Sequence, residues 1–80
     1  MQPQFLGDLR EWLVQDRKLA VRALDLMDAV LRDPFTGIGK PEPLGHLGTD
    51  VWSRRIDQRH RLVYVVYHDR IVFLHARYHY

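Results

Sequence analysis

The chain has 80 residues, and its hydrophobic fraction of 46% predicts one globular domain rather than a disordered tail. It contains no cysteine, which excludes disulfide bridges and thiolate metal sites. No apolar run approaches the roughly 20 residues of a membrane span, and no signal peptide is evident, so we expect a soluble, cytoplasmic protein with no membrane partner.

The net charge of +2 is unevenly distributed along the chain. Residues 1–33 contain five Lys/Arg against six Asp/Glu, whereas residues 34–80 contain seven against four and all five histidines. This asymmetry favours a polyanion as the partner of the C-terminal half. A solvated surface with a chance imbalance is the alternative.

Residues 1–33 carry the hydrophobic periodicity of two helices. The apolar stripe of the first consists of Phe5, Leu6, Leu9, Trp12 and Leu13. The stripe of the second consists of Ala20, Leu24, Met27 and Leu31, widened by Val21 and Val30. Asp16 is expected to be the N-cap of the second helix. Asp33 is expected to end it, because a residue before proline is disfavoured in the α region.

The rest of the chain predicts a loop followed by strands. Residues 34–50 contain three prolines and four glycines, and we expect no regular element there. Segments rich in β-branched and aromatic residues then predict three strands, VWSRRID (51–57), HRLVYVVYH (60–68) and RIVFLHARYHY (70–80). The predicted fold of residues 1–80 is therefore α+β, with two N-terminal helices packed on one face of a small antiparallel sheet.

Alternation along the last two strands separates two faces. The even positions are almost wholly apolar and are expected to meet the helices; they are Leu62, Tyr64, Val66, Val72, Leu74, Ala76 and Tyr78. The odd positions become cationic far from the turn, at Arg61, Arg77 and His79. Arg61 and His79 share this face if the hairpin loop has an odd number of residues, or if a bulge intervenes. We predict a three- or five-residue loop centred on Asp69, which pairs Arg61 with Arg77.

The C-terminal half combines a carboxylate, imidazoles and guanidinium groups. Glu42 lies between two prolines, which restrict where its carboxylate can point. The arginines that cluster with Tyr and His are suited to phosphate binding; they are Arg54, Arg55, Arg59, Arg61 and Arg77. Taken singly, these residues are ordinary surface charges. Together they are what acid–base cleavage of RNA requires: a base for the ribose 2′-OH, an acid for the departing 5′-oxygen, and cations for the phosphorane.

A metal centre is not expected. His75 and His79 lie four residues apart, which on a strand separates them by about 13 Å, and no carboxylate cluster accompanies them. Acid–base cleavage at the 2′-OH needs no metal or other cofactor, and DNA cannot undergo it.

Four segments together resemble one protein family. The segments GIGKPEPL (37–44), WSRRI (52–56), HRLVY (60–64) and ARYHY (76–80) are similar to those of the YoeB/Txe toxins of the RelE superfamily. The resemblance runs from about Asp16 to the last residue. It implies a fold like that of compact microbial ribonucleases, and a toxin that cleaves mRNA in the A site of the ribosome.

The resemblance also implies roles for individual residues. Glu42 matches the family's general base, Arg61 the phosphate-stabilising arginine and His79 the general acid, which Tyr80 supports. Substrate-binding positions are matched by His46 and Arg55. Lys40 is expected to contact RNA or the ribosome, and Arg77 is expected to bind RNA with the other arginines. Where the family motif usually continues KPEPLK, Gly45 replaces the lysine that helps to hold the phosphate.

The implied partners are the 70S ribosome with its mRNA and a YefM-like antitoxin, whose flexible acidic segment wraps the toxin. The family normally opens with a short strand, which the residues before the first helix do not provide. A sheet edge left bare in this way would bind a partner or favour a homodimer. The alternative function is a non-catalytic module that docks antitoxin or RNA. A gyrase-poisoning toxin of the same fold is disfavoured, because those relatives generally lack the KPEP glutamate and the terminal YHY.

Overall fold

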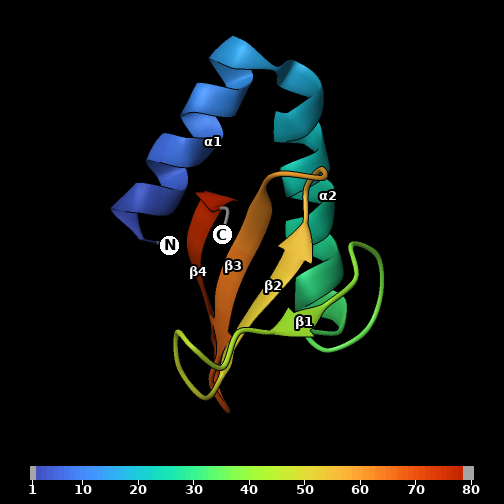
Figure 1. Cartoon of the computed structure of the whole chain (residues 1–80), viewed down its shortest axis with the longest axis vertical. Coiled ribbons are helices and arrows are strands. Elements are labelled where there is room, and N and C mark those ends of the chain that lie inside the picture. The colour runs from blue at the N-terminus through green and yellow to red at the C-terminus, as the bar shows by residue number, and fades with distance from the viewer. Residues whose placement is uncertain (1, 79–80) are drawn as a thin grey trace.

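The computed structural model describes residues 2–78 and divides them into two helices and four strands. The helices are α1 (Pro3–Gln15) and α2 (Arg17–Arg32), and the strands are β1 (Glu42–Pro43), β2 (Val51–Arg55), β3 (Arg61–Val66) and β4 (Ile71–Tyr78). All strand pairs are antiparallel, in the order β1-β2-β3-β4. The helices form an arch over the sheet, with α1 beside β4 (Figure 1). The predicted α+β fold is confirmed.

Hydrophobic residues pack on both faces of the sheet, but unequally. The main core lies between the helices and one face, which we call the covered face; it includes Phe5, Trp12, Leu26, Leu62, Tyr64, Phe73 and Ala76. A smaller cluster on the opposite side, which we call the open face, consists of Leu44, Val51 and Val63, with Val65, Leu74 and Tyr78 packed against it. Among residues 2–78 no helix packs over the open face, which leaves the polar residues of this face available for chemistry.

The helix boundaries follow the sequence closely. Asp16 has an extended backbone and is both the C-cap of α1 and the N-cap of α2, as predicted for the latter, although its side chain makes no capping hydrogen bond. Asp33 is the extended C-cap of α2, as expected before Pro34. No helix in the described part of the chain is long and apolar enough to cross a membrane.

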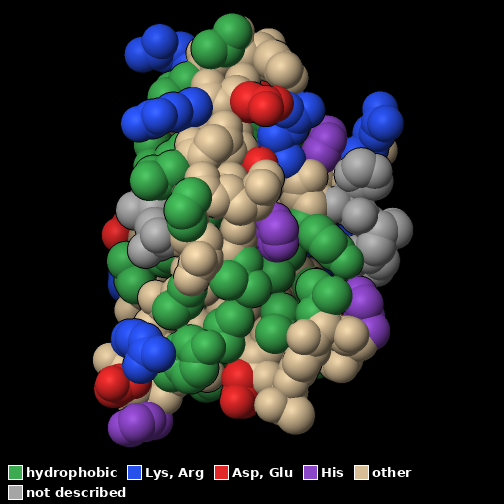
Figure 2. All heavy atoms as spheres, turned by 90° about the vertical axis from the view of Figure 1, so that its left-hand side faces the viewer, with side chains coloured by type: hydrophobic (Ala, Val, Ile, Leu, Met, Phe, Trp, Pro, Cys, Tyr) green, Lys and Arg blue, Asp and Glu red, His purple; other side chains and the backbone are tan. Residues whose placement is uncertain are grey.

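The buried face of α2 differs from the predicted stripe. Its buried residues are Ala20, Ala23, Leu26, Ala29 and Val30, whereas Val21, Leu24 and Leu31 are exposed. The reason is that alanine side chains let α2 approach the sheet closely. The buried face of the helix therefore consists mostly of small residues and not of its most hydrophobic ones. On α1, Phe5 and Trp12 are buried as predicted, but Leu6 and Leu13 are exposed. Figure 2, which views the side on which α1 lies, shows many hydrophobic side chains at the surface.

The predicted loop contains a short strand, so the expectation of no regular element across 34–50 is wrong. Glu42 pairs with Ser53 and Pro43 pairs with Trp52. Proline is tolerated at this position because β1 is an edge strand, where a missing N–H costs no ladder hydrogen bond. Before β1 the backbone is left-handed at Gly37, Gly39 and Lys40.

The hairpin between β3 and β4 corrects the predicted register. Val66 pairs with Ile71, and the Tyr67 N–H donates to the Arg70 carbonyl, which leaves a two-residue turn at His68-Asp69. The odd-numbered loop is therefore wrong, and Arg61 pairs with Tyr78 rather than with Arg77. The register also shifts on both sides of Val63, but Arg61 still pairs with Tyr78, so the structure lacks the pairing that was predicted to bring His79 onto the face of Arg61.

The even turn and the shifts also change the faces of β4. Ile71 and Phe73 pack in the main core, whereas Leu74 and Tyr78 pack on the open face, in each case opposite to the prediction. Ala76 lies in the main core as predicted. A change of one residue in strand register exchanges the two faces of a strand. The register shifts near Val63 exchange them again, which returns Ala76 to the predicted face.

The outer edge of β4 is covered by α1 at Ala76. The Ala76 N–H donates to the Asp8 carboxylate (2.9 Å), and the Trp12 indole N–H donates to the Ala76 carbonyl (2.6 Å). Asp8 is buried and also accepts a hydrogen bond from Gln4. Side chains of α1 thus satisfy backbone groups that a neighbouring strand would otherwise pair, which closes this edge to strand addition at Ala76.

Candidate active site

Glu42 and Arg61, which are far apart in the sequence, meet on the open face. Glu42 pairs with Ser53 across β1 and β2, and Arg61 begins the adjacent strand β3. One guanidinium nitrogen of Arg61, Nη1, donates to Glu42 Oε1 (3.0 Å) and to Ser53 Oγ (3.1 Å). The carboxylate and the hydroxyl therefore fix the orientation of the guanidinium.

The two charged side chains differ in their access to solvent. The Arg61 side chain is 15% exposed and that of Glu42 is 51% exposed. A mostly covered guanidinium is held in place, while a half-exposed carboxylate can be reached by a ligand. This arrangement places a proton acceptor, the Glu42 carboxylate, beside a fixed positive charge, the Arg61 guanidinium. Acid–base chemistry at a phosphate requires both.

His79 and Tyr80 lie outside the described residues. The last described residue, Tyr78, pairs directly with Arg61 and packs on the open face. Its ring lies 5.6 Å from that of His75, measured between centroids. The chain therefore reaches Arg61 at Tyr78, immediately before the two terminal residues to which the prediction assigns the acid and its support.

Arg55 and Lys40 border this pair. Arg55 lies opposite Arg61 on the neighbouring strand, and its backbone N–H donates to the Gly39 carbonyl (2.7 Å). This hydrogen bond fixes the segment that carries Lys40, two residues before Glu42. Both side chains are exposed. Arg55 is thus a cross-strand neighbour of Arg61, and Lys40 lies close to Glu42 in the sequence, whereas their predicted RNA contacts stay predictions.

His46 and Arg77 occupy other positions. His46 is exposed in the turn after β1, which is closed by a hydrogen bond from the Leu47 N–H to the Leu44 carbonyl. The guanidinium of Arg77 forms an ion pair with Glu11 and lies 4.6 Å from the ring centroid of Trp12. The structure does not bring Arg77 to Glu42 or Arg61, and its predicted RNA contact stays a prediction.

Arg54 is not a surface cation, although sequence reasoning grouped it with the phosphate-binding arginines. Its side chain is fully buried on the covered face. Its guanidinium donates to the Tyr64 hydroxyl and to the carbonyls of Asp33, Thr36 and Ile38. Alternation along β2 provides the signal that separates Arg54 from Arg55, because adjacent residues of a strand project to opposite faces.

The charge on Arg54 also contributes to the local electrostatics. Hydrogen bonds from the Phe35 N–H and from Thr36 lower the pKa of Asp33, with a smaller effect from Arg54. Burial raises the pKa of Tyr64, which stays a neutral hydroxyl and donates to the Pro34 carbonyl (2.7 Å). Arg54 and Tyr64 together hold the segment 33–38, which leads towards Lys40 and Glu42.

Two further features were missed by sequence reasoning. One is Ser53, whose hydroxyl orients Arg61. The signal in the sequence is strand alternation, which places this small polar residue on the same face of β2 as Arg55. The other is the turn before β3, held by Asp57, whose Oδ1 accepts the backbone N–H groups of Arg59 (2.8 Å) and His60 (2.7 Å). An Asp followed by N–H donors two and three residues later is a recognised turn signal.

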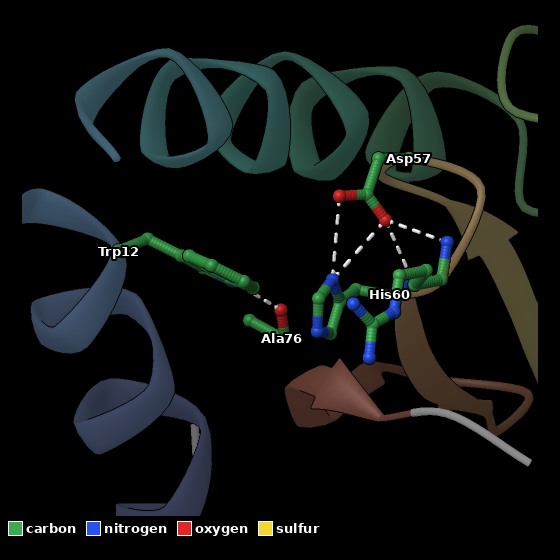
Figure 3. A network of polar contacts seen from close by, with 5 residues as sticks. Trp12, Asp57, His60 and Ala76 are labelled. Carbon is green, nitrogen blue, oxygen red and sulfur yellow. Dashed lines mark hydrogen bonds and ion pairs between the residues drawn. The ribbon is translucent and has the colours of Figure 1, made fainter. Parts of the chain in front are cut away.

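This turn is linked to α1 through His60 (Figure 3). The Nδ1 atom of His60 lies 3.1 Å from Asp57 Oδ1, and its ring packs edge-on against Trp12 with centroids 4.8 Å apart. Burial acts to raise the pKa of Asp57, but the hydrogen bonds from Arg59 and His60 together lower it. The start of β3, and with it Arg61, is therefore anchored to both the turn and the helix.

The described residues include no group of three or more His, Cys, Asp or Glu side chains that could hold a metal ion.

Comparison with known proteins gives consistent matches over the whole chain. The family model described as "YoeB-like toxin of bacterial type II toxin-antitoxin system" matches residues 1–80. The toxin YoeB of Mycobacterium bovis is 51% identical over 78 residues, which cover 98% of this chain and 92% of that protein.

Two solved structures from Staphylococcus aureus have the same fold. The YoeB dimer superposes with a TM-score of 0.90 at 36% identity, covering 99% of this chain and 92% of that one. The heterotetrameric YoeB–YefM toxin–antitoxin complex contains a chain that superposes with a TM-score of 0.85, with the same identity and coverage.

Proposed function

Because this chain belongs to the family of YoeB-like toxins of bacterial type II toxin–antitoxin systems, we propose that it is an endoribonuclease that cleaves mRNA in the ribosomal A site and so inhibits translation. The observation that carries the proposal is the contact between Glu42 and Arg61 on the open face of the sheet. A half-exposed carboxylate and an oriented guanidinium are what attack by a ribose 2′-OH on a phosphate requires.

In the proposed reaction Glu42 removes the proton from the 2′-OH. The 2′-oxygen forms a bond to the adjacent phosphorus while the bond from phosphorus to the 5′-oxygen breaks. His79 donates a proton to that departing oxygen, with Tyr80 in support, and the products are a 2′,3′-cyclic phosphate and a 5′-hydroxyl. No metal takes part in these steps.

Arg61 changes partners in this scheme. Without RNA its guanidinium contacts Glu42 and Ser53. When a phosphate binds, the guanidinium neutralises the charge that develops on the phosphorane, and the Glu42 carboxylate turns to the 2′-OH. Lys40, His46 and Arg55 contact the RNA around the scissile bond, and Arg77 contributes an RNA contact from the side of α1.

The proposed partners in the bacterial cytoplasm are the ribosome and a YefM-like antitoxin. The S. aureus relatives have been solved as a YoeB dimer and as a YoeB–YefM complex. The helices of this chain expose hydrophobic side chains that a partner could cover; they include Val14, Val21, Leu24 and Leu31. We extend antitoxin binding, and dimer formation, to this chain on that basis.

The test is cleavage of A-site mRNA on purified ribosomes by the wild-type protein and by the Glu42→Ala and His79→Ala variants. Loss of general acid–base catalysis is expected to lower the rate by about 10²- to 10⁴-fold in each variant. Asp25→Ala is the control, because it removes an exposed carboxylate that lies on α2. Unchanged cutting by both active-site variants would refute the assigned roles.

A non-catalytic binding module is the second candidate function. It is favoured by Gly45, which stands where the family usually carries a phosphate-holding lysine. In that case growth inhibition and RNA or antitoxin binding survive the loss of Glu42 and His79, and ribosomes show no mRNA cleavage with the wild-type protein.

A further inference from the structure

A pocket of about 330 Å³ lies between α2, the segment before β1 and the turn between β2 and β3. We call it the turn pocket. Its lining includes the cationic residues Arg22, Lys40 and Arg55, together with Ile56, Asp57 and Gln58. Its volume is at the small end of the range for ligand sites and suits one nucleotide rather than a larger molecule.

Three cationic residues from three separate elements line the pocket. Arg22 comes from α2, and its Nη2 lies 3.4 Å from the backbone carbonyl of Arg55 at the end of β2. Lys40 comes from the segment before β1, where its left-handed backbone (φ 52°) sets its direction. Within residues 2–78 none of the three forms an ion pair with a carboxylate, whereas Arg32, Arg61, Arg70 and Arg77 all do. Their positive charge is therefore available to an anion.

Asp57, the acidic residue among the described residues of the lining, does not cancel this charge. The Asp57 carboxylate is directed to the backbone N–H groups of Arg59 and His60 and to the His60 ring (Figure 3). Those contacts also fix the turn, so the pocket wall is preformed. Ile56, which is buried, contributes an apolar surface beside the cations.

The pocket is adjacent to the proposed catalytic pair. Arg55 lies directly opposite Arg61 across β2 and β3, and Lys40 precedes Glu42 by two residues. A single strand of RNA with one phosphate at Arg61 would therefore bring a neighbouring nucleotide to the turn pocket. Cations for a phosphate and an apolar surface for a nucleoside are the combination that single-stranded RNA recognition uses.

We propose that the turn pocket binds one nucleotide of RNA, with Arg22 and Lys40 on its phosphate, Arg55 on the side towards Arg61 and Ile56 against its nucleoside. The proposal rests on the proposed function and adds Arg22 and a defined subsite to it. The phosphate can belong to the mRNA beside the scissile bond or to ribosomal RNA, and the chemistry of recognition is the same for both.

The first arm of the test measures binding of a 2′-O-methyl triadenylate, which cannot be cleaved, by fluorescence anisotropy at several salt concentrations. The variants are Arg22→Gln and Lys40→Gly, the second chosen because glycine tolerates the left-handed backbone. Each is expected to weaken binding by roughly three- to tenfold and to reduce the salt slope by about 0.7. Arg32→Gln is the matched control, because it removes the same charge from the exposed C-terminal end of α2.

The second arm measures binding of the same proteins to 70S ribosomes whose A site is empty or filled with a 2′-O-methyl codon. If Arg22→Gln and Lys40→Gly bind the triadenylate and the filled ribosomes more weakly than the wild type does, the nucleotide in the turn pocket belongs to mRNA. Weaker binding to ribosomes alone, whether filled or empty, assigns it to ribosomal RNA. Equal behaviour of Arg22→Gln, Lys40→Gly and Arg32→Gln in both arms would overturn the proposal. Neither arm depends on cleavage. A wild-type protein without cleavage activity would therefore refute the proposed function, while the binding measurements would still decide whether the turn pocket binds RNA.

Discussion

Arg54 and Arg61 lie on neighbouring strands and project to opposite faces of the same sheet. On the covered face, Arg54 is surrounded by the Tyr64 hydroxyl and three backbone carbonyls. On the open face, Arg61 contacts the side chains of Glu42 and Ser53. The carbonyls hold a fully buried guanidinium that a ligand cannot reach, whereas the half-exposed Glu42 carboxylate is open to a ligand.

The comparison shows how one sheet separates stability from chemistry. A polar group on the covered face holds the fold, because its partners have no water to replace it. A polar group on the open face keeps partners that a substrate can displace. Substitutions on the two faces should therefore separate changes in stability from changes in activity.

The largest effect is expected for Arg54→Met on the covered face. Methionine fills part of the space but leaves the carbonyls of Asp33, Thr36 and Ile38 without their donor. We expect the free energy of unfolding to fall by about 3–5 kcal/mol. Urea unfolding measures it, with Arg55→Met as the control, because the next residue along β2 is exposed and should change stability by less than about 0.5 kcal/mol. Equal losses in the two variants would break the comparison.

Arg61→Ala should have the opposite profile. Loss of a guanidinium aimed at the phosphorane is expected to lower the rate of A-site cleavage by about 10²- to 10³-fold, or roughly 2.7–4 kcal/mol of activation free energy. Stability should change by less than about 1 kcal/mol, because the ion pair with Glu42 is partly solvated. Single-turnover kinetics and urea unfolding of the same preparation check both values. If the cleavage rate falls only in proportion to the fraction of folded protein, Arg61 does not stabilise the phosphorane.

A third effect, on the covered face, concerns Asp8. Asp8→Ala removes the acceptor of the Ala76 N–H and is expected to lower stability by about 1–3 kcal/mol. Hydrogen exchange at the Ala76 amide should become faster as well, because the edge of β4 opens there. Asp28→Ala is the control: its exposed ion pair with Arg32 should be worth no more than about 0.5 kcal/mol. If exchange at Ala76 is unchanged, α1 does not protect this edge.

Much of the fold could be predicted from the sequence because periodicity and breakers act locally. The two helices, the extended Asp33 and the three long strands follow from them. The faces of β4 could not be predicted, because two register shifts around Val63 depend on packing between strands. The buried face of α2 was missed because close packing selects alanine, which hydrophobicity ranks below the exposed Leu24 and Leu31.

The candidate site was predictable in part. The family resemblance identified Glu42 and Arg61, which the structure brings into contact, and strand alternation alone could have separated Arg54 from Arg55. Arg22 carries no local signal, because its place beside the turn pocket arises only when α2 packs near the end of β2. A surface formed by residues of several elements is the hardest to predict from the order of residues in the sequence.

The smallest effect is expected for Gly45→Lys, which restores the cation usual in the family. A Cβ at Gly45 would meet no heavy atom within 4 Å, and its backbone is not among the left-handed positions, so lysine should be accepted without strain. An exposed cation near the scissile phosphate should raise cleavage by about two- to fivefold. Gly7→Lys, at an equally open position, adds the same charge to α1 instead of the loop after β1. A gain shared by both variants would mean general attraction to RNA, whereas a gain confined to Gly45→Lys places the missing cation on the open face beside Glu42.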